Sequence, residues 1–313
     1  MFYSEEPLVD LTEVAEVPAR LPVPPFEARK GLSYEPHGYR NTLDLYVPQG
    51  MQGPLPVVIY IHGGGIMDGG TEAGQDLGLP DVWRDALLAR GLAIANINYR
   101  LVFADPGSRH DEVTGPFPAQ IQDCLTVVRF LRAEGAGLGL DPGRIGVMGH
   151  SFAGCLASLA GLTWDREEFL TDTHSGVSSR VDAVINSAGN TDLRIWGNQT
   201  RFDLKMWNRP NADYVNPNEF VREYAQTGAE FDPTNKAVGD ASPITHVRPD
   251  APPFLMLYGF RDLAIQGEML HMRLKGAGVS SRLIIIPGAG HGLAAFAGTG
   301  DLMAEFLRGR LVK

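Results

Sequence analysis

The chain has 313 residues, of which 44% are apolar and 20% are charged. This composition provides enough hydrophobic material for a large core and too little charge for a disordered chain. At about 150 residues per domain the length suggests two domains, but α/β folds often form one larger unit, so composition leaves the domain count open. The formal net charge is −10 without a basic block, which argues against a nucleic-acid partner because such binding depends on clustered Lys and Arg.

Membrane and export signals are the next features to consider. Apolar runs such as Val57 to Ile61 are much shorter than the roughly 20 residues that cross a bilayer, which predicts no membrane span. The first ten residues, MFYSEEPLVD, have neither a basic n-region nor an apolar h-region, so they contain no secretory signal. We therefore expect a cytoplasmic protein, with a secreted mature form as the alternative. Cys124 and Cys155 are expected to be two buried thiols.

The predicted elements follow one another in a regular order. Residues 1–40 are rich in proline and have no sustained hydrophobic period, which predicts an irregular N-terminal arm. From residue 41 to 313, apolar β-branched runs alternate with helical periods, which is typical of an α/β fold with a mostly parallel central sheet and helices on both faces. Buried strands are predicted at 56–61, 92–98, 144–149, 181–188, 253–259 and 282–288. Helices are predicted at 81–90, after Pro118, at 152–162, at 265–277 and at 292–309.

Residues from about 190 to 242 interrupt this alternation with aromatic, polar and proline residues. An insertion at this place predicts a cap over the carboxyl ends of the strands, where open α/β sheets bind ligands. Within it, Trp196, Trp207 and Tyr214 are candidates for an aromatic wall that holds a sugar ring or an aromatic acyl group. The alternative is that these aromatic residues form a small core of the cap itself.

The segment RIGVMGHSFAG (144–154) has the pattern of a buried strand, a tight turn and a helix. This is the geometry of a nucleophile elbow, which would expose the Ser151 hydroxyl above the sheet. Small residues at 149, 153 and 154 let the strand and helix backbones approach, although Ala153 stands where the usual pattern has glycine. Taken alone, the segment is also compatible with an ordinary turn between a strand and a helix.

A second glycine-rich segment, His62-Gly63-Gly64-Gly65, follows the predicted strand 56–61. The backbone N–H groups of Gly64 and Gly65, together with that of Phe152, can donate to the oxyanion of a tetrahedral intermediate. A phosphate-binding loop is the competing interpretation, but the chain has no Gly-Lys-Ser/Thr and no G-x-G-x-x-G. We expect His62 to orient this loop rather than to take part in catalysis.

A serine nucleophile needs a base and a carboxylate that orients the base. His291 lies in a glycine-rich turn after the strand predicted at 282–288, and Asp262 follows the strand predicted at 253–259. The order Ser151, Asp262, His291 is that of α/β-hydrolases. Asp192 is the rival for the acid, because some hydrolases place this residue after an earlier strand.

Together, HGGG, GHSFAG, the Asp262 segment and PGAGHG resemble the α/β-hydrolase superfamily, over roughly residues 32 to 313. The chain is most similar to the HGGG-type esterase/lipase branch, which includes hormone-sensitive-lipase-like proteins and bacterial acetyl-xylan and feruloyl esterases. It departs from that pattern at Ala153, at His150 where hormone-sensitive-lipase relatives usually have Asp, and in the aromatic-rich segment. His150 is expected to be a packed or solvated neighbour of the nucleophile.

The resemblance implies hydrolysis of short-chain or carbohydrate-linked esters, of the acetyl or feruloyl type, through an acyl-enzyme on Ser151. His291 would act as the base, Asp262 would orient it, and Gly64, Gly65 and Phe152 would form the oxyanion hole. No organic cofactor is needed, and the remaining histidines lack metal-ligand spacing. Two alternatives stay open, an arylformamide or amide hydrolase with the same triad and a non-catalytic binding protein on this scaffold. The expected partner is a small-molecule or carbohydrate ester, and a homo-oligomer is left open.

Overall fold

Eight strands form one sheet in the computed structural model, which describes residues 18–36, 40–64, 78–102, 115–195, 221–222, 224–225 and 231–312. The strands are β1 (Phe26–Ser33), β2 (Thr42–Pro48), β3 (Leu55–Ile61), β4 (Ala93–Ile97), β5 (Leu140–His150), β6 (Ala183–Ser187), β7 (Phe254–Gly259) and β8 (Ser281–Ile286). Their order in the sheet is β1-β2-β4-β3-β5-β6-β7-β8. Strand β2 is antiparallel to β1 and β4, whereas the pairs from β4 to β8 are parallel.

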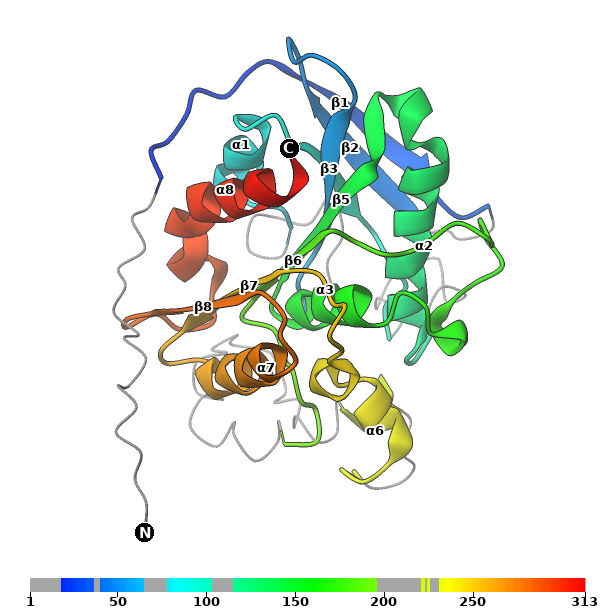
Figure 1. Cartoon of the computed structure of the whole chain (residues 1–313), viewed down its shortest axis with the longest axis vertical. Helices are drawn as coiled ribbons and strands as arrows, with labels where there is room; N and C mark the ends of the chain where they lie inside the picture. The colour runs from blue at the N-terminus through cyan, green and yellow to red at the C-terminus, as the bar shows by residue number, and fades with distance from the viewer. Residues whose placement is uncertain are drawn as a thin grey trace, which may run out of the picture.

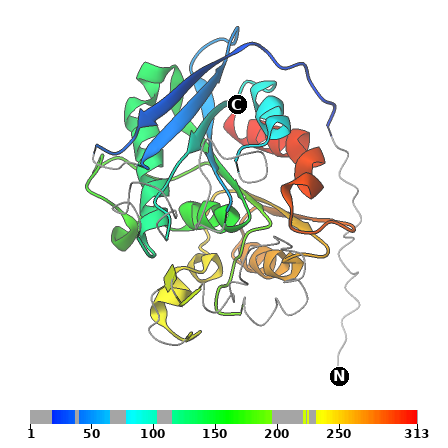
Figure 2. The same ribbon diagram turned by 180° about the vertical axis from the view of Figure 1, so that it is seen from behind.

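Helices cover both faces of this sheet (Figures 1 and 2). The α-helices are α1 (Asp81–Leu88), α2 (Ala119–Glu134), α3 (Phe152–Leu162), α6 (Lys236–Asp240), α7 (Ala264–Gly276) and α8 (Gly300–Leu311). Short 3₁₀ helices are η1 (Gly135–Leu138), η2 (Glu167–Phe169), η5 (Pro243–His246) and η6 (Leu293–Thr299). Helices α2, α3 and α7 contribute to the hydrophobic core on one face, and α1 and α8 contribute to the core on the other. The predicted α/β fold with a mostly parallel sheet is therefore confirmed.

The period of the sequence explains how these helices attach to the sheet. Helix α2 begins directly after Pro118, and its predicted apolar stripe is buried at Ile121, Cys124, Leu125, Val128 and Leu131. Residues at this spacing lie on one side of a helix, so burying them fixes the side that faces the sheet. Cys124 on α2 and Cys155 on α3 are free and buried, as expected from the sequence.

Two expectations about the edges of the sheet were wrong. Residues 26–33 form β1, although the whole segment 1–40 was expected to be irregular. This strand has no buried residue, and its charged residues Glu27, Arg29 and Lys30 leave no apolar run to detect. Strand β8 was expected to be covered on both faces, but all its residues are half-buried or exposed because it is the last strand of the sheet and has a neighbour on one side alone.

Two further differences concern the later parts of the chain. The helix predicted at 292–309 is divided into η6 and α8, which begins at Gly300. Of the predicted cap at 190–242, the structure describes residues 190–195, 221–222, 224–225 and 231–242, which include α6. The placement of a cap over the sheet therefore stays a prediction. In the described ranges, no helix has the length and apolar character needed to cross a bilayer.

Candidate active site

Ser151 lies in a sharp turn between the last residue of β5 and the first residue of α3. Its backbone has φ 63° and ψ −139°, a conformation that costs a non-glycine residue of order 1–3 kcal/mol. The backbone N–H of Ser151 donates to the carbonyl of Ser187 at 2.8 Å, and the N–H of Gly154 donates to the carbonyl of Ser151 at 2.8 Å. These bonds hold the turn in the strained conformation of a nucleophile elbow.

The elbow has no room for larger residues at two of its glycines. A Cβ atom on Gly149 would lie 2.4 Å from the carbonyl oxygen of Ala153, and one on Gly154 would lie 2.4 Å from Oδ1 of Asn186. Ala153 itself is fully buried, so its methyl group is accommodated where the usual pattern has glycine. The departure noted in the sequence therefore leaves the close approach of strand and helix intact.

The structure brings Ser151, His291 and Asp262 together. The Oγ atom of Ser151 lies 2.7 Å from Nε2 of His291, and Nδ1 of His291 lies 2.9 Å from both carboxylate oxygens of Asp262. Because a carboxylate accepts, Nδ1 carries the proton and Nε2 accepts from the serine hydroxyl. The Asp262 side chain is 5% exposed and that of His291 is 18% exposed, so the carboxylate is buried while the imidazole reaches the surface.

Asp192, the rival candidate for the acid, pairs with Arg194 and not with His291. Its carboxylate accepts from the guanidinium of Arg194 at 2.8 and 2.7 Å. Its backbone N–H donates to Oε1 of Gln266 at 2.8 Å. The structure therefore places Asp262, and not Asp192, against the imidazole.

The turns that carry Asp262 and His291 are joined directly. Strands β7 and β8 run parallel, with Gly259 opposite Ile286, so both turns leave the same end of the sheet. The N–H of Arg261 donates to the carbonyl of Ala289 at 2.9 Å. This bond fixes the spacing of the two turns, which in turn sets the distance between the carboxylate and the imidazole.

The glycine-rich loop after β3 lies beside the elbow, because β3 and β5 are parallel neighbours with Ile61 opposite Gly149. Gly64 has φ 98°, a left-handed conformation that a side chain would strain. Phe152 is the first residue of α3. The N–H groups of the first helical turn have no partner within the helix, so that of Phe152 suits the predicted role of a donor. Gly65, the third predicted donor, lies outside the described residues. Gly64 and Phe152 thus follow the ends of two neighbouring parallel strands.

His62 ties this loop to Tyr99, which lies just beyond the end of β4. Its ring is fully buried and stacks on Tyr99, with centroids 4.4 Å apart and an interplanar angle of 18°. The hydroxyl of Tyr99 donates to the carbonyl of His62 at 2.9 Å. The Tyr99 contact was not foreseen, since it joins residues 37 positions apart and no local motif signals it.

His150 is another residue whose contacts the sequence did not reveal. Its Nε2 lies 2.9 Å from the backbone carbonyl of His291, and its Nδ1 lies 2.9 Å from Oγ of Ser187. Burial, followed by the neighbouring His291, lowers the pKa of His150 to about 3. The expectation of a packed neighbour is correct, but the ring also contacts the backbone of the predicted base.

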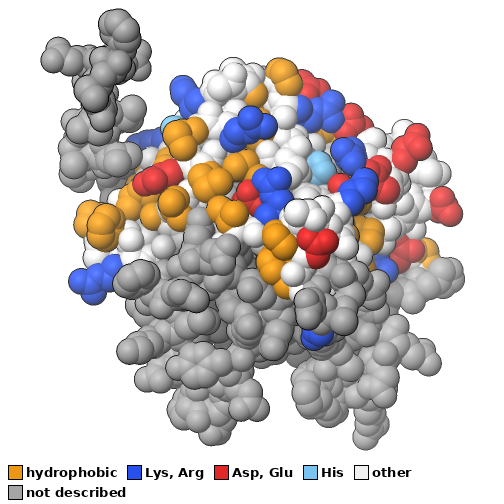
Figure 3. Space-filling model, turned by 90° about the horizontal axis from the view of Figure 1, so that it is seen from below, with side chains coloured by type: hydrophobic (Ala, Val, Ile, Leu, Met, Phe, Trp, Pro, Cys, Tyr) orange, Lys and Arg blue, Asp and Glu red, His pale blue; other side chains and the backbone are white. Residues whose placement is uncertain are grey.

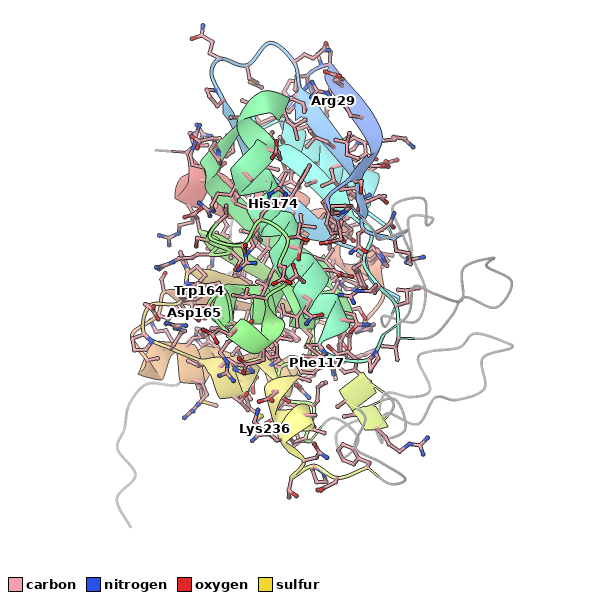
Figure 4. All side chains as sticks on the ribbon, turned by 90° about the vertical axis from the view of Figure 1, so that its right-hand side faces the viewer. Arg29, Phe117, Trp164, Asp165, His174 and Lys236 are labelled. Atoms are coloured by element: carbon pink, nitrogen blue, oxygen red, sulfur yellow. The ribbon has the colours of Figure 1, made fainter. Side chains whose placement is uncertain are left out.

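The candidate substrate residues Trp196, Trp207 and Tyr214 lie outside the described residues. One aromatic residue of the same stretch, Tyr224, is described and packs edge-on against Phe152, with centroids 5.2 Å apart, and against Phe117 at 5.5 Å. In Figure 4, Phe117 lies toward the α6 end of the molecule, far from Arg29 on β1. Tyr224 therefore connects the interrupted stretch to Phe152, the residue that follows Ser151.

The turn after β7 and helix α7 expose large apolar side chains, namely Phe260, Ile265 and Met272. Figure 3 views the molecule from the α7 end and shows hydrophobic side chains gathered on that face.

Across the described ranges, no group of three or more His, Cys, Asp or Glu side chains is arranged to hold a metal ion.

Similar solved structures define the class of this fold. A truncated carbohydrate esterase from gut microbiota has a TM-score of 0.72 and 24% identity, covering 92% of this chain and 97% of the other. A bifunctional GH43-CE protein of Bacteroides eggerthii has a TM-score of 0.72 and 26% identity, covering 91% of this chain and 35% of the other. The fold is that of the α/β-hydrolase esterases.

The sequence comparisons identify the family within that class. Residues 43–273 match the family model BD-FAE, and the chain therefore belongs to the BD-FAE family. Esterase LipC of Mycobacterium tuberculosis is 30% identical over 244 residues, which is 76% of this chain and 53% of that protein. The chain spans about half the length of the curated relatives that it matches over most of its own length.

Proposed function

We propose that the chain is a serine carboxylesterase that hydrolyses short-chain or carbohydrate-linked esters through an acyl-enzyme. The observation that carries the proposal is the continuous line of hydrogen bonds from Ser151 through His291 to Asp262, with distances of 2.7 and 2.9 Å. This arrangement activates a serine hydroxyl, because the imidazole can accept its proton while the carboxylate stabilises the imidazolium.

In the acylation step, Oγ of Ser151 attacks the ester carbonyl carbon and its proton moves to Nε2 of His291. The carbonyl oxygen becomes an oxyanion, which accepts from the N–H groups of Phe152, Gly64 and Gly65. One such donor typically contributes about 2.7–4 kcal/mol of transition-state stabilisation. When the intermediate collapses, the bond to the leaving oxygen breaks and His291 gives its proton to the departing alcohol.

In the deacylation step, a water molecule attacks the acyl carbonyl and His291 accepts one of its protons. The second tetrahedral intermediate then expels Ser151, which regains a proton from Nε2. Asp262 stays ionised and keeps Nδ1 protonated, so the imidazole has the correct tautomer in both steps. The products are a carboxylic acid and an alcohol.

One comparison supports the substrate class. The chain spans a third of the bifunctional GH43-CE protein at 26% identity, a relative whose name pairs a carbohydrate esterase with a second activity.

The test is a panel of p-nitrophenyl acetate, butyrate and laurate, methyl ferulate, acetylated xylan and an arylformamide, assayed with wild type and Ser151→Ala. We expect acetate or butyrate to exceed laurate, and kcat to fall by roughly 10⁶-fold, or to background, in the variant. A preference for laurate would contradict the acyl size, and a preference for the arylformamide would favour the amide hydrolase. A folded wild type that is inert toward every member would contradict the enzyme class and favour a binding protein.

A further inference from the structure

We propose that His150 is a positioning residue for the base of the catalytic triad, and that it acts by holding the backbone carbonyl of His291. The inference rests on the proposed function, since it assigns a task within that site. The contacts involved are those of the His150 ring with the backbone of His291 and with the side chain of Ser187.

The two hydrogen bonds of His150 fix its protonation. A carbonyl oxygen can only accept, so the 2.9 Å contact with the carbonyl of His291 requires a proton on Nε2. A neutral imidazole then has an acceptor at Nδ1, and the hydroxyl of Ser187 donates a hydrogen bond to it at 2.9 Å. His150 is therefore a neutral donor with one tautomer, and its low pKa, caused mainly by burial, keeps it so at working pH.

The surroundings of the ring make this donor rigid. His150 is 4% exposed, and its ring packs against Phe296 at 5.0 Å and Trp83 at 6.1 Å between centroids. The indole of Trp83 also donates to the carbonyl of Phe296 at 3.2 Å. The chain that follows His291 is thus tied to the same aromatic cluster that holds the His150 ring.

His291 needs such an anchor because it lies between Gly290 and Gly292, whose backbones have little intrinsic rigidity. Two of its contacts are with reacting or charged side chains, Ser151 and Asp262. The third, from His150, holds its backbone and comes from the residue that precedes the nucleophile in β5. The hydrogen bond from His150, the neighbour of Ser151 in the chain, therefore resists a displacement of His291 relative to Ser151.

Ser187 extends the same link to the elbow. Its carbonyl accepts from the backbone N–H of Ser151 at 2.8 Å, and its hydroxyl orients His150. One residue of β6 thus fixes both the nucleophile and the donor that holds the base. This arrangement predicts that losing the Nε2 donor disturbs the chemical step more than substrate binding, because a misplacement on the order of 1 Å can cost about 10²-fold in rate.

The test compares His150→Gln with His150→Asn, because a glutamine amide N–H can replace Nε2–H, whereas the shorter asparagine reaches only the position of Nδ1. We expect His150→Asn to lower kcat on p-nitrophenyl acetate by roughly 10- to 100-fold with KM changed less than about threefold. His150→Gln should stay within about fivefold of wild type. Equal losses in both variants, unchanged kcat in both, or an effect confined to KM would overturn the proposal.

A variant of Ser187 and a spectroscopic readout keep the proposal testable if a variant of His150 fails to fold. Ser187→Ala removes the donor that fixes the tautomer, and it should lower kcat by about three- to tenfold, as expected for one neutral hydrogen bond. The low-field proton resonance of His291 Nδ1–H reports the contact with Asp262 without substrate, and it should weaken in His150→Asn and persist in His150→Gln. If wild type hydrolyses no ester, the proposed function fails. If wild type is active and the resonance and kcat are the same in both variants, the positioning role alone fails.

Discussion

Both carboxylate oxygens of Asp262 lie 2.9 Å from Nδ1 of His291. This contact joins the turns after β7 and β8, and a single proton on Nδ1 is shared between two acceptors. The imidazole therefore cannot exchange the roles of its two nitrogens without losing a charge-assisted hydrogen bond. The proposed role of His291 as a base depends on this contact, because a proton held on Nδ1 leaves Nε2 able to accept one from Ser151.

The first prediction concerns that carboxylate. Asp262→Asn should lower kcat by about four orders of magnitude, as in a serine-protease triad, because an amide can stabilise the wrong imidazole tautomer. Steady-state assays with p-nitrophenyl acetate measure this effect. Asp192→Asn is the matched control, since Asp192 pairs with Arg194 and should retain activity within about threefold. The reverse ranking of the two variants would assign the acid to Asp192.

The second prediction concerns the loop beside the elbow. Tyr99→Phe keeps the stack on His62 but removes the hydroxyl that donates to the His62 carbonyl. We expect kcat to fall by roughly tenfold, less than the 10²–10³-fold that follows loss of an oxyanion donor itself.

Tyr34→Phe is the control for Tyr99→Phe, because the Tyr34 hydroxyl donates to the carbonyl of Asn98 at 2.6 Å and accepts from Nδ2 of Asn41 at 3.2 Å, and neither partner belongs to the glycine-rich loop. Tyr99→Phe should lose about 1 kcal/mol of unfolding free energy, and Tyr34→Phe, which removes two hydrogen bonds, about 1–2 kcal/mol, both measured by urea denaturation. Tyr34→Phe should keep kcat within about threefold. Equal losses of kcat in the two variants would show that Tyr99 has no specific effect on the loop.

The third prediction concerns stability in acid. The pKa of His150 falls from its ordinary value of 6.5 to about 3 in the folded chain, mainly through burial. Between these values the unfolded chain binds more protons, so the free energy of unfolding falls as pH is lowered, by up to about 1.4 kcal/mol per pH unit. His150→Gln should reduce this slope between pH 4.5 and 6.5 in urea titrations, and it should run parallel to wild type above pH 7. An unchanged slope in the acid range would contradict the assignment of a buried neutral imidazole.

Much of this site could be predicted from local patterns. Buried apolar runs located the parallel strands, and parallel strands deliver their carboxyl ends to one edge of the sheet. Ser151, Asp262 and His291 each follow such a run, which is why residues 140 positions apart could be assigned to one site. The helix period likewise predicted the buried stripe of α2, from Ile121 to Leu131.

The contacts that escaped prediction are of another kind. His150 binds a backbone carbonyl 141 residues away. Every residue has such a carbonyl, so the sequence does not indicate which one is the acceptor. Tyr99 reaches the carbonyl of His62 in the same way. Strand β1 escaped because its apolar residues, Phe26 and Leu32, are separated by charged residues. Backbone pairing with β2 holds the strand in the sheet, and the hydrophobic pattern does not predict such pairing.

The fourth prediction concerns the two thiols. Burial raises the pKa of Cys124 and of Cys155 above the usual range, and the thiolate is the reactive form of cysteine. The native protein should therefore resist an aromatic disulfide reagent at pH 8 under conditions in which urea-unfolded protein reacts at both thiols. Esterase activity should be unaffected by the same treatment. Rapid modification of the native protein with loss of activity would argue against chemistry centred on Ser151.

Covalent labelling shows whether Ser151 is the nucleophile of an acyl-transfer site. Wild type and Ser151→Ala are incubated with a fluorophosphonate, and the adduct is located by intact mass and peptide mapping. We expect one adduct in wild type, on Ser151, formed in step with the loss of ester hydrolysis, and none in the variant. A wild type that keeps full activity without an adduct, or an adduct on another residue that accompanies inactivation, would contradict this role of Ser151.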